Sequence, residues 1–286
     1  MNRVKSIFIS AFMTGLFVMT FHTALKFVYY GFDPALLGAL LAVGLPAGFF
    51  AYAIVNLFIK RMPRATLGIK LITIGTAVGA ALAIYGSLTS DNIRALTLVY
   101  ALTGFCGWVA YDKWYSYQGG SMNSRLTVGA ELPSFDVENE NGNKVSSDSF
   151  HGKPTLLIFY RGNWCPFCMS QIKEIALRYR ELADKGARIA LISPQPRKFT
   201  RNLAKKYDGP FIFLVDAGNR AARQLDIASI GGLPASMEIF GYHSDTVKPT
   251  AIITDKDGKI IYADLAEDYR VRPQPDDFLR VLEEQT

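Results

Sequence analysis

Ten residues decide the fold of the C-terminal half: Phe159-Tyr160-Arg161-Gly162-Asn163-Trp164-Cys165-Pro166-Phe167-Cys168. The run before them, residues 155–160, is almost wholly apolar and predicts a strand buried on both faces of a sheet. Helical spacing follows over residues 166–185, and Gly186 is typical of a position just after a helix end. The Cys-x-x-Cys pair therefore lies at the junction of a buried strand and a helix.

Strands and helices alternate through the rest of this half. Asp255-Lys256-Asp257-Gly258 predicts a tight hairpin between two strands, and residues 227–248 read as a loop-rich insertion. Alternation of this kind predicts one α/β sandwich. The further predicted strands are 188–193, 211–215, 250–254 and 259–263, and the further predicted helices are 197–207, 219–225 and 275–284.

The two cysteines of the opening stretch are placed to work as a redox pair. A thiol at the start of a helix faces unpaired backbone N–H groups and the positive end of the helix dipole, and both favour the thiolate. We therefore expect the pKa of Cys165 to lie at about 5–7, below the ordinary value of about 8.5. Pro166 suits the first helical position. One turn brings Cys168 beside Cys165, so that Cys165 attacks and Cys168 resolves the intermediate.

Other uses of a Cys-x-x-Cys pair fit this sequence less well. A structural zinc ion takes four ligands, whereas the chain has three cysteines, three histidines and no second Cys-x-x-Cys. The third cysteine, Cys106, lies in an apolar segment and is expected to be a buried apolar residue. We therefore predict no metal and no cofactor other than the redox-active disulfide Cys165–Cys168.

Four long apolar segments fill the N-terminal half, at residues 6–27, 35–59, 67–88 and 95–115. Each is long enough to cross a hydrocarbon core of about 30 Å. Residues 1–124 carry nine Lys and Arg against three Asp, which accounts for the whole formal net charge of +6. A nucleic-acid-binding domain would carry this excess on its soluble part. The predicted partner is the lipid bilayer, and no nucleic acid is expected.

Small residues recur inside these segments, and two pairs have the spacing of close helix packing. Gly44-x-x-x-Gly48 and Gly75-x-x-x-Gly79 would let neighbouring helices approach. Glycine is also common in membrane helices for no such reason, so both interpretations stay open.

Basic residues flank the four segments unevenly. If the N-terminus is cytoplasmic, eight bases face the cytoplasm and two face the other side, as the positive-inside rule requires. With an even number of spans, the C-terminal half then lies in the cytoplasm. The membrane is expected to be a bacterial inner membrane. A cleaved signal peptide is the alternative for the first segment, but its apolar run is long and no small-x-small cleavage site follows. The eight bases are Arg3, Lys5, Lys60, Arg61, Arg64, Lys70, Lys113 and Arg125, and the two are Lys26 and Arg94.

From about Val128 to its end, the chain resembles the thioredoxin superfamily and, more narrowly, the AhpC/TSA peroxiredoxin-like redoxins. The resemblance implies an α/β thioredoxin-like redoxin domain (128–286). Together with the apolar segments, the sequence therefore predicts a membrane all-α four-helix bundle (1–116), a polar linker (117–127) and this domain. The motifs that carry it are Phe150-His151-Gly152-Lys153-Pro154, the ten-residue stretch, Lys248-Pro249-Thr250, Asp257-Gly258 and the tail Asp268-Tyr269-Arg270-Val271-Arg272-Pro273-Gln274-Pro275.

The resemblance also implies roles for individual residues. Cys165 is similar to the nucleophilic cysteine of the family and Cys168 to the resolving one. Pro249, followed by Thr250, matches the proline that is cis in thioredoxin folds and faces the active-site cysteines. Trp164 would cover the thiols. Arg161 could hold a thiolate or an oxyanion, although a surface arginine is the alternative.

The sequence also departs from the family pattern. Peroxiredoxins proper carry a proline seven residues and a hydroxyl residue three residues before the cysteine, where this chain has Ile158 and Gly162. Fast peroxidase chemistry is therefore in doubt. Thioredoxins bury an acid where this chain has Phe159, so proton transfer at Cys168 must use another group or water.

The predicted function is that of a membrane-anchored thiol–disulfide oxidoreductase or peroxiredoxin-like antioxidant enzyme. Its substrate would be a disulfide-bearing protein or a hydroperoxide, and its reductant a thiol of the thioredoxin or glutathione type. The alternative is a redoxin-fold copper-binding or copper-delivery protein that uses Cys165, Cys168 and His243, because thiolates and imidazole suit copper. The membrane half is expected to be an anchor or a partner-binding bundle.

Overall fold

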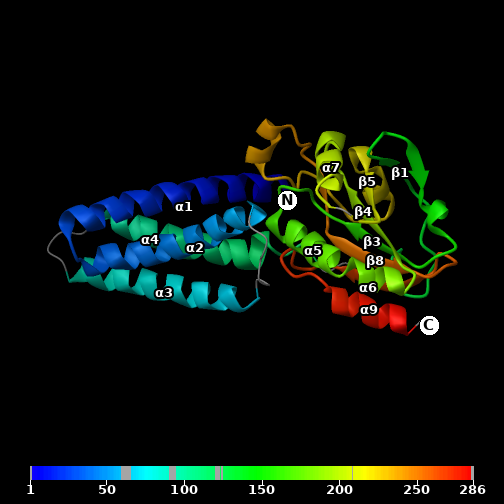
Figure 1. Cartoon of the computed structure of the whole chain (residues 1–286). Helices are drawn as coiled ribbons and strands as arrows, with labels where there is room; N and C mark the ends of the chain where they lie inside the picture. The colour runs from blue at the N-terminus through cyan, green and yellow to red at the C-terminus, as the bar shows by residue number, and fades with distance from the viewer. Residues whose placement is uncertain are drawn as a thin grey trace. The chain divides into compact units, whose positions relative to one another are not determined.

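The computed structural model describes residues 2–58, 66–89, 95–119, 123, 125–207 and 209–284. They form two compact units, Ile7–Tyr117 and Met1–Ser6 with Gln118–Thr286 (Figure 1). Four of the bases counted for orientation lie outside the described residues, as does part of the predicted linker, residues 120–122 and 124. Those bases are Lys60, Arg61, Arg64 and Arg94.

The N-terminal unit is helical. Three stretches, residues 2–30, 34–55 and 69–88, are long and apolar enough to cross a membrane. The predicted fourth segment is helical throughout, but its α-helical part has only 15 residues and continues as a π-helix. The elements are α1 (Asn2–Tyr30), α2 (Pro34–Phe58), α3 (Thr66–Leu88), α4 (Ala95–Val109) and the π-helix η1 (Ala110–Tyr115).

Glycine decides how closely α2, α3 and α4 approach. A Cβ on Gly79 of α3 would lie 2.7 Å from the backbone N of Ala42 and from the carbonyl oxygen of Gly38, both on α2. Of the two glycine pairs in the sequence, Gly75 and Gly79 therefore mark a close helix contact, in which Gly79 lies against Gly38 of α2. Gly44 and Gly48 mark no such contact, because a Cβ on Gly48 would meet nothing within 4 Å.

The outer surface of this unit is apolar, which fits contact with lipid. Large side chains such as Phe21 on α1, Leu71 on α3 and Val99 on α4 are exposed. Cys106, predicted to be buried, is exposed as well. Ala101, Gly104 and Trp108 form the buried stripe of α4 at spacings of three and four residues, and Cys106 falls between them.

The second unit is built on a seven-stranded mixed sheet with the order β2-β1-β5-β4-β3-β8-β9. The three central strands, β3, β4 and β5, run parallel, and β8, β9 and β1 pair with their neighbours antiparallel. The strands are β1 (Asp136–Asn139), β2 (Lys144–Ser146), β3 (Thr155–Phe159), β4 (Arg188–Ser193), β5 (Phe211–Val215), β8 (Thr250–Thr254) and β9 (Ile260–Leu265).

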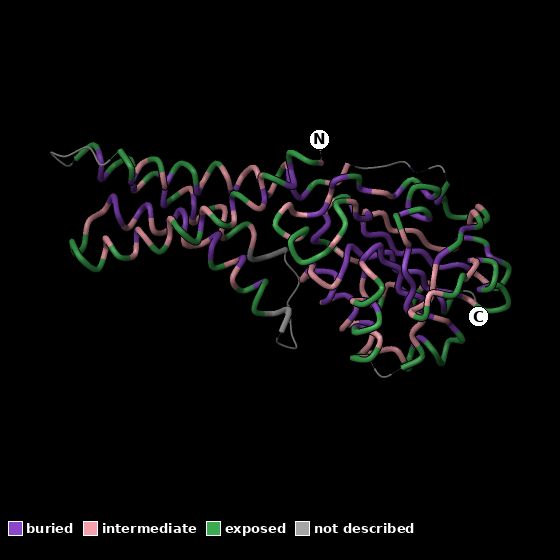
Figure 2. Tube along the Cα trace, turned by 90° about the horizontal axis from the view of Figure 1, so that it is seen from above, coloured by how far each residue is buried: buried purple, intermediate pink, exposed green. Residues whose placement is uncertain are grey.

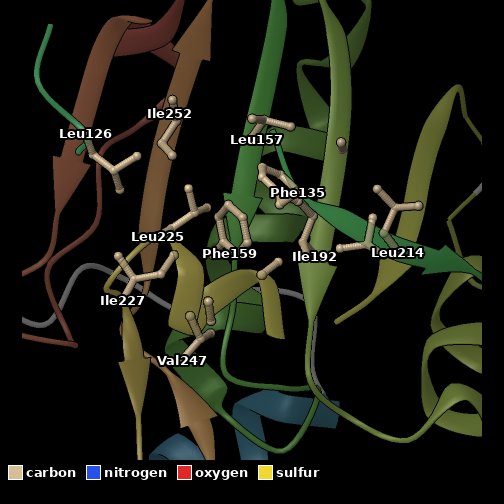
Figure 3. Close-up of a cluster of buried hydrophobic side chains, with 14 of the residues drawn as sticks. Leu126, Phe135, Leu157, Phe159, Ile192, Leu214, Leu225, Ile227, Val247 and Ile252 are labelled. Carbon is tan, nitrogen blue, oxygen red and sulfur yellow. The ribbon is translucent and has the colours of Figure 1, made fainter. Parts of the chain in front are cut away.

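The central strands are buried on both faces, which explains why their sequences are apolar without alternation. Figure 2 shows the buried residues gathered along them. On one face, Leu157 and Phe159 of β3 join Ile192 of β4 and Ile252 of β8 in the core cluster drawn in Figure 3. Because side chains alternate along a strand, Ile158 points to the opposite face.

Helices cover the sheet, and one of them differs from its prediction. The helix predicted over residues 166–185 is divided at Arg178, whose backbone (φ −117°, ψ 18°) is not helical. The insertion 227–248 contains two short strands and a 3-10 helix. The remaining elements are η2 (Ser147–Phe150), α5 (Pro166–Leu177), α6 (Tyr179–Asp184), α7 (Arg197–Ala204), η3 (Ala217–Asn219), α8 (Arg220–Gln224), β6 (Ala228–Ser229), η4 (Ala235–Phe240), β7 (Thr246–Val247) and α9 (Pro275–Glu283).

Candidate active site

The two cysteines of the Cys-x-x-Cys motif lie at the N-terminus of α5. Cys165 is the N-cap residue with an extended backbone, Pro166 occupies the first turn, and Cys168 follows within that turn. Both are free thiols, and each is only 1% exposed. The thiol of Cys165 donates a hydrogen bond to the sulfur of Cys168. The fold thus assembles a buried dithiol.

The surroundings of the dithiol favour the thiolate on Cys168 over that on Cys165, so the pKa of Cys165 is raised and not lowered as predicted. Burial raises the pKa of Cys165, and its hydrogen bond to Cys168 raises it further. Burial also disfavours the Cys168 thiolate, but the hydrogen bond from Cys165 and the charges of Arg272 and Arg161 outweigh it and lower the pKa to about 6. Of two adjacent buried thiols, only one ionises readily, because a second negative charge beside the first is unfavourable. The thiol that ionises is the one whose sulfur accepts hydrogen bonds from its neighbours.

Arg161 is one source of those donors. Its backbone N–H donates to the sulfur of Cys168. The residue is only 5% exposed. Its guanidinium lies 4.7 Å from the ring centroid of Trp164 and 4.9 Å from that of Tyr269, and it donates to the carbonyl of Gly232 over 2.8 Å. Cation–π contacts on two sides fix its position, so the alternative of a surface arginine is excluded.

A segment after β9 covers the start of α5. We call residues 268–274 the strap. Tyr269 packs edge-on against Phe167 at 5.5 Å, and the side chain of Gln171 donates to the carbonyl of Pro273 over 3.3 Å. Arg272 directs its guanidinium at the dithiol, with Nη2 4.0 Å from the Sγ of Cys168. The strap therefore packs against Cys168 and the first turns of α5.

Behind the dithiol lies a buried polar network. Gln195 donates through Nε2 to the hydroxyls of Tyr160 and Thr200, each over 3.1 Å, and its Oε1 accepts from the backbone N–H of Asn163 over 2.8 Å. Burial and the charge on Cys168 raise the pKa of Tyr160. Tyr160 therefore stays protonated. Its hydroxyl can form hydrogen bonds but cannot replace the buried acid of thioredoxins, at whose position this chain has Phe159.

Gly162 cannot be replaced by the hydroxyl residue of peroxiredoxins in this backbone. Its φ is +145°, which L side chains rarely adopt, and a Cβ would lie 2.5 Å from Nε1 of Trp164. The departure from the peroxiredoxin pattern is thus built into the loop before Cys165.

Pro249 does not have the predicted cis bond, because the structure contains no cis peptide bond among its described residues. The segment is held extended instead: Lys248 N–H donates to Ile227 O over 2.7 Å, and Ala266 N–H donates to Pro249 O over 3.2 Å. A trans bond is also the lower-energy form of an X–Pro peptide. Thr250 is buried and uses its hydroxyl locally, donating to the carbonyl of Lys248.

The three ligands proposed for copper do not come together. His243 is exposed, whereas Cys165 and Cys168 are buried. Within the residues that the structure describes, no three His, Cys, Asp or Glu side chains are grouped to hold a metal ion. The copper interpretation therefore lacks its third ligand, because loop 227–248 presents the imidazole to solvent.

Sequence reasoning missed three residues around the dithiol: Arg272, Tyr160 and Gln195. Two of them lay inside motifs that carried the family resemblance, but no role was assigned to them. Gln195 had no sequence signal at all, because only the parallel pairing of β3 with β4 brings the residues after both strands together.

The sequence of the second unit identifies its family. Residues 128–263 match the model of the AhpC/TSA family. The C-terminal unit is similar to this family over these residues, and we call it the AhpC/TSA domain after the match. The AhpC/TSA domain is therefore a redoxin with a thioredoxin-like fold, and its chemistry is that of an oxidoreductase.

Proteins similar to the AhpC/TSA domain include a thiol–disulfide oxidoreductase and a peroxiredoxin. The thiol-disulfide oxidoreductase ResA of Bacillus thuringiensis subsp. konkukian is 28% identical over 169 residues, which cover 59% of this chain and 86% of the relative. The chloroplastic peroxiredoxin Q of Sedum lineare is 31% identical over 116 residues, covering 40% of this chain and 62% of the relative. Among solved structures, the peroxidoxin BcpB from Mycobacterium tuberculosis has a TM-score of 0.46 and 20% identity, over 56% of this chain and 99% of that one.

Proposed function

We propose that the protein is a membrane-anchored thiol–disulfide oxidoreductase whose redox couple is the dithiol–disulfide pair Cys165–Cys168. The observation that carries this proposal is the pair of hydrogen-bonded thiols at the N-terminus of α5, enclosed by Arg161 and Arg272 in an AhpC/TSA domain. The substrate is a disulfide-bearing protein or a hydroperoxide, and a thiol of the thioredoxin or glutathione type reduces the enzyme again.

The geometry supports a division of labour between the two thiols. The S–H of Cys165 already donates to the sulfur of Cys168, so Cys168 can take up that proton while Cys165 attacks a substrate disulfide. One substrate sulfur leaves with its electron pair and is protonated by solvent. Cys168 then loses its proton and attacks Cys165, and the second substrate sulfur leaves. Two electrons pass from the dithiol to the substrate.

Reduction of a disulfide is favoured over fast peroxide turnover. The hydroxyl that would polarise a peroxide has no place at residue 162, because of the glycine backbone and the Trp164 side chain there. Arg161 and Arg272 could still stabilise a peroxide oxygen, so weak peroxidase activity is part of the proposal.

The test measures both reactions with the purified full-length chain in detergent. We expect wild type to reduce insulin disulfides with dithiothreitol as donor, with slower consumption of hydroperoxide. Cys165→Ser should lower the disulfide-reduction rate at least 100-fold, because the attacking sulfur is lost. Cys106→Ser is the matched control and should retain full activity, since that thiol lies on α4. If wild type and Cys165→Ser were equally inactive in both assays, the proposal would be wrong.

The location follows from the helical unit. The three stretches long enough to cross a membrane, together with the helical stretch 95–115, support four spans. The excess of basic residues then supports a cytoplasmic N-terminus and a cytoplasmic AhpC/TSA domain. A cytoplasmic dithiol rests in its reduced form, which suits a reductase.

A further inference from the structure

We infer that Arg272 is a catalytic residue of the dithiol centre: its guanidinium, carried by the strap, stabilises the sulfur anion of Cys168 when that sulfur resolves the mixed disulfide. This inference rests on the proposed function and assigns a role to a residue outside the Cys-x-x-Cys motif. It starts from the direct approach of Nη2 to Sγ, at 4.0 Å.

The strap holds Arg272 in place through contacts on both sides. Tyr269 is packed between Phe167 and the guanidinium of Arg161, and the carbonyl of Pro273 accepts a hydrogen bond from Gln171 on α5. After the strap, α9 begins with a capping box between Gln274 and Asp277. Both ends of the short chain that carries Arg272 are thus anchored, one of them on the helix of the cysteines.

The two arginines of the strap have different partners. Arg270 forms an ion pair with Asp268, and its Nε lies 2.9 Å from a carboxylate oxygen. Arg272 forms no ion pair within the described part of the chain; its nearest polar contacts are the carbonyl of Val271 at 3.4 Å and the sulfur of Cys168. Its buried Nε has no hydrogen-bond partner there. The charge of Arg272 is therefore available to the sulfur.

The charged and titratable groups around Cys168 come from four directions. Cys165 donates from the cap of α5, Tyr160 and Arg161 directly follow β3, and Arg272 comes from the strap. Asp264 of β9 also interacts with the charge of Arg272, and burial raises the pKa of its carboxyl.

The chemical step that uses Arg272 is the second half of the cycle. Cys168, protonated after the first half, gives its proton to solvent and attacks the sulfur of Cys165. The Cys165–Cys168 bond forms, the bond from Cys165 to the substrate sulfur breaks, and the electron pair leaves with the substrate, which takes a proton from solvent. Because an unshielded anion in a buried site is costly, a guanidinium beside Cys168 accelerates this step.

The test measures how alkylation of Cys168 depends on pH. The full-length chain carries Cys106→Ser and Cys165→Ser, so that Cys168 is its one remaining thiol, and it reacts with dilute iodoacetamide in detergent. With Arg272 present, we expect a midpoint below the ordinary thiol pKa of about 8.5, because both guanidinium groups remain beside the sulfur. Arg272→Gln should raise that midpoint by about one to two pH units, as removal of a charge at this distance does. Arg272→Lys, which keeps the charge, should restore at least half of the shift.

The matched control is Arg280→Gln on α9, whose side chain is 70% exposed and pairs with Asp277; it should leave the midpoint unchanged. Loosening of the strap would affect the Gln and Lys variants alike, whereas a midpoint restored by lysine requires the charge. An unchanged midpoint in Arg272→Gln would overturn the inference. So would a midpoint in Arg272→Lys that lies about one to two pH units above that of wild type, a comparison that does not need a folded Gln variant. A shifted midpoint in a protein inactive toward insulin and peroxide would refute the proposed function alone.

Discussion

At the scale of single residues, one sulfur anion governs how the reduced protein responds to pH. The pKa of Cys168 is about 6 in the folded chain, whereas an unfolded cysteine has a pKa of about 8.5. Between these values the unfolded chain binds a proton that the folded chain has released. The free energy of unfolding therefore rises with pH in this window and loses the contribution below pH 6. Cys165, with a raised pKa, stays protonated there and adds nothing.

This predicts a difference between the two redox states. The thermal unfolding midpoint of the reduced protein, relative to the oxidised one, should rise between pH 6 and pH 8. The underlying change is at most about 1.4 kcal/mol per pH unit. The oxidised protein is the natural control, because its disulfide has no thiol to titrate. Parallel pH curves for both states would show that Cys168 has an ordinary pKa.

At the scale of elements, the N-terminal helices depend on a backbone contact that admits no side chain. A Cβ on Gly79 would lie 2.7 Å from two backbone atoms of α2, which cannot move aside as a flexible side chain can. We expect Gly79→Ala to separate α2 from α3 and to lower the thermal unfolding midpoint of the helical unit by several degrees. Circular dichroism of the full-length chain in detergent would measure the loss.

Gly48→Ala on α2 is the control for this substitution, because a Cβ there meets nothing within 4 Å. It should leave the midpoint unchanged or slightly raised, since alanine favours a helix. Equal midpoints for Gly79→Ala and wild type would mean that α2 and α3 do not pack as described.

The elements also show what sequence patterns can and cannot predict. The predicted strands 188–193, 211–215 and 250–254 agree with β4, β5 and β8 residue for residue, because strands buried on both faces are apolar throughout. The short strands β2, at the edge of the sheet, and β1, next to it, were not predicted, since their sequences, KVS and DVEN, carry few apolar residues. The break at Arg178 has no glycine or proline to announce it.

In the candidate active site, too, the sequence predicts some features and not others. The position of Cys165 and Cys168 on a helix start follows from their spacing and from Pro166. Which of the two carries the charge depends on Arg272, more than 100 residues away in sequence, and no local pattern encodes that approach. The helix-terminus argument alone therefore predicted a lowered pKa for the wrong sulfur.

At the scale of the whole molecule, the proposed orientation places the AhpC/TSA domain in the cytoplasm. Cys165 is too deeply buried to serve as a label. Leu177, 83% exposed on α5, is the better reporter. In a cysteine-free background, Leu177→Cys should resist a membrane-impermeant maleimide in intact cells and react fully after the membrane is opened.

A second reporter controls for reagent access. A cysteine placed at Phe32, 75% exposed between α1 and α2, should label in intact cells if the N-terminus is cytoplasmic. The reverse pattern, with Leu177→Cys labelled from outside, would invert the topology and place the dithiol in an oxidising compartment.

Burial of both thiols also bears on how fast a substrate can reach them. Each cysteine is only 1% exposed, so a disulfide as large as that of a protein substrate reaches the sulfur only when the surrounding chain moves aside. If that motion is slower than the chemistry, the rate at high substrate concentration stops rising and equals the rate of the motion. The same burial limits chance encounters between the resting dithiol and oxidants.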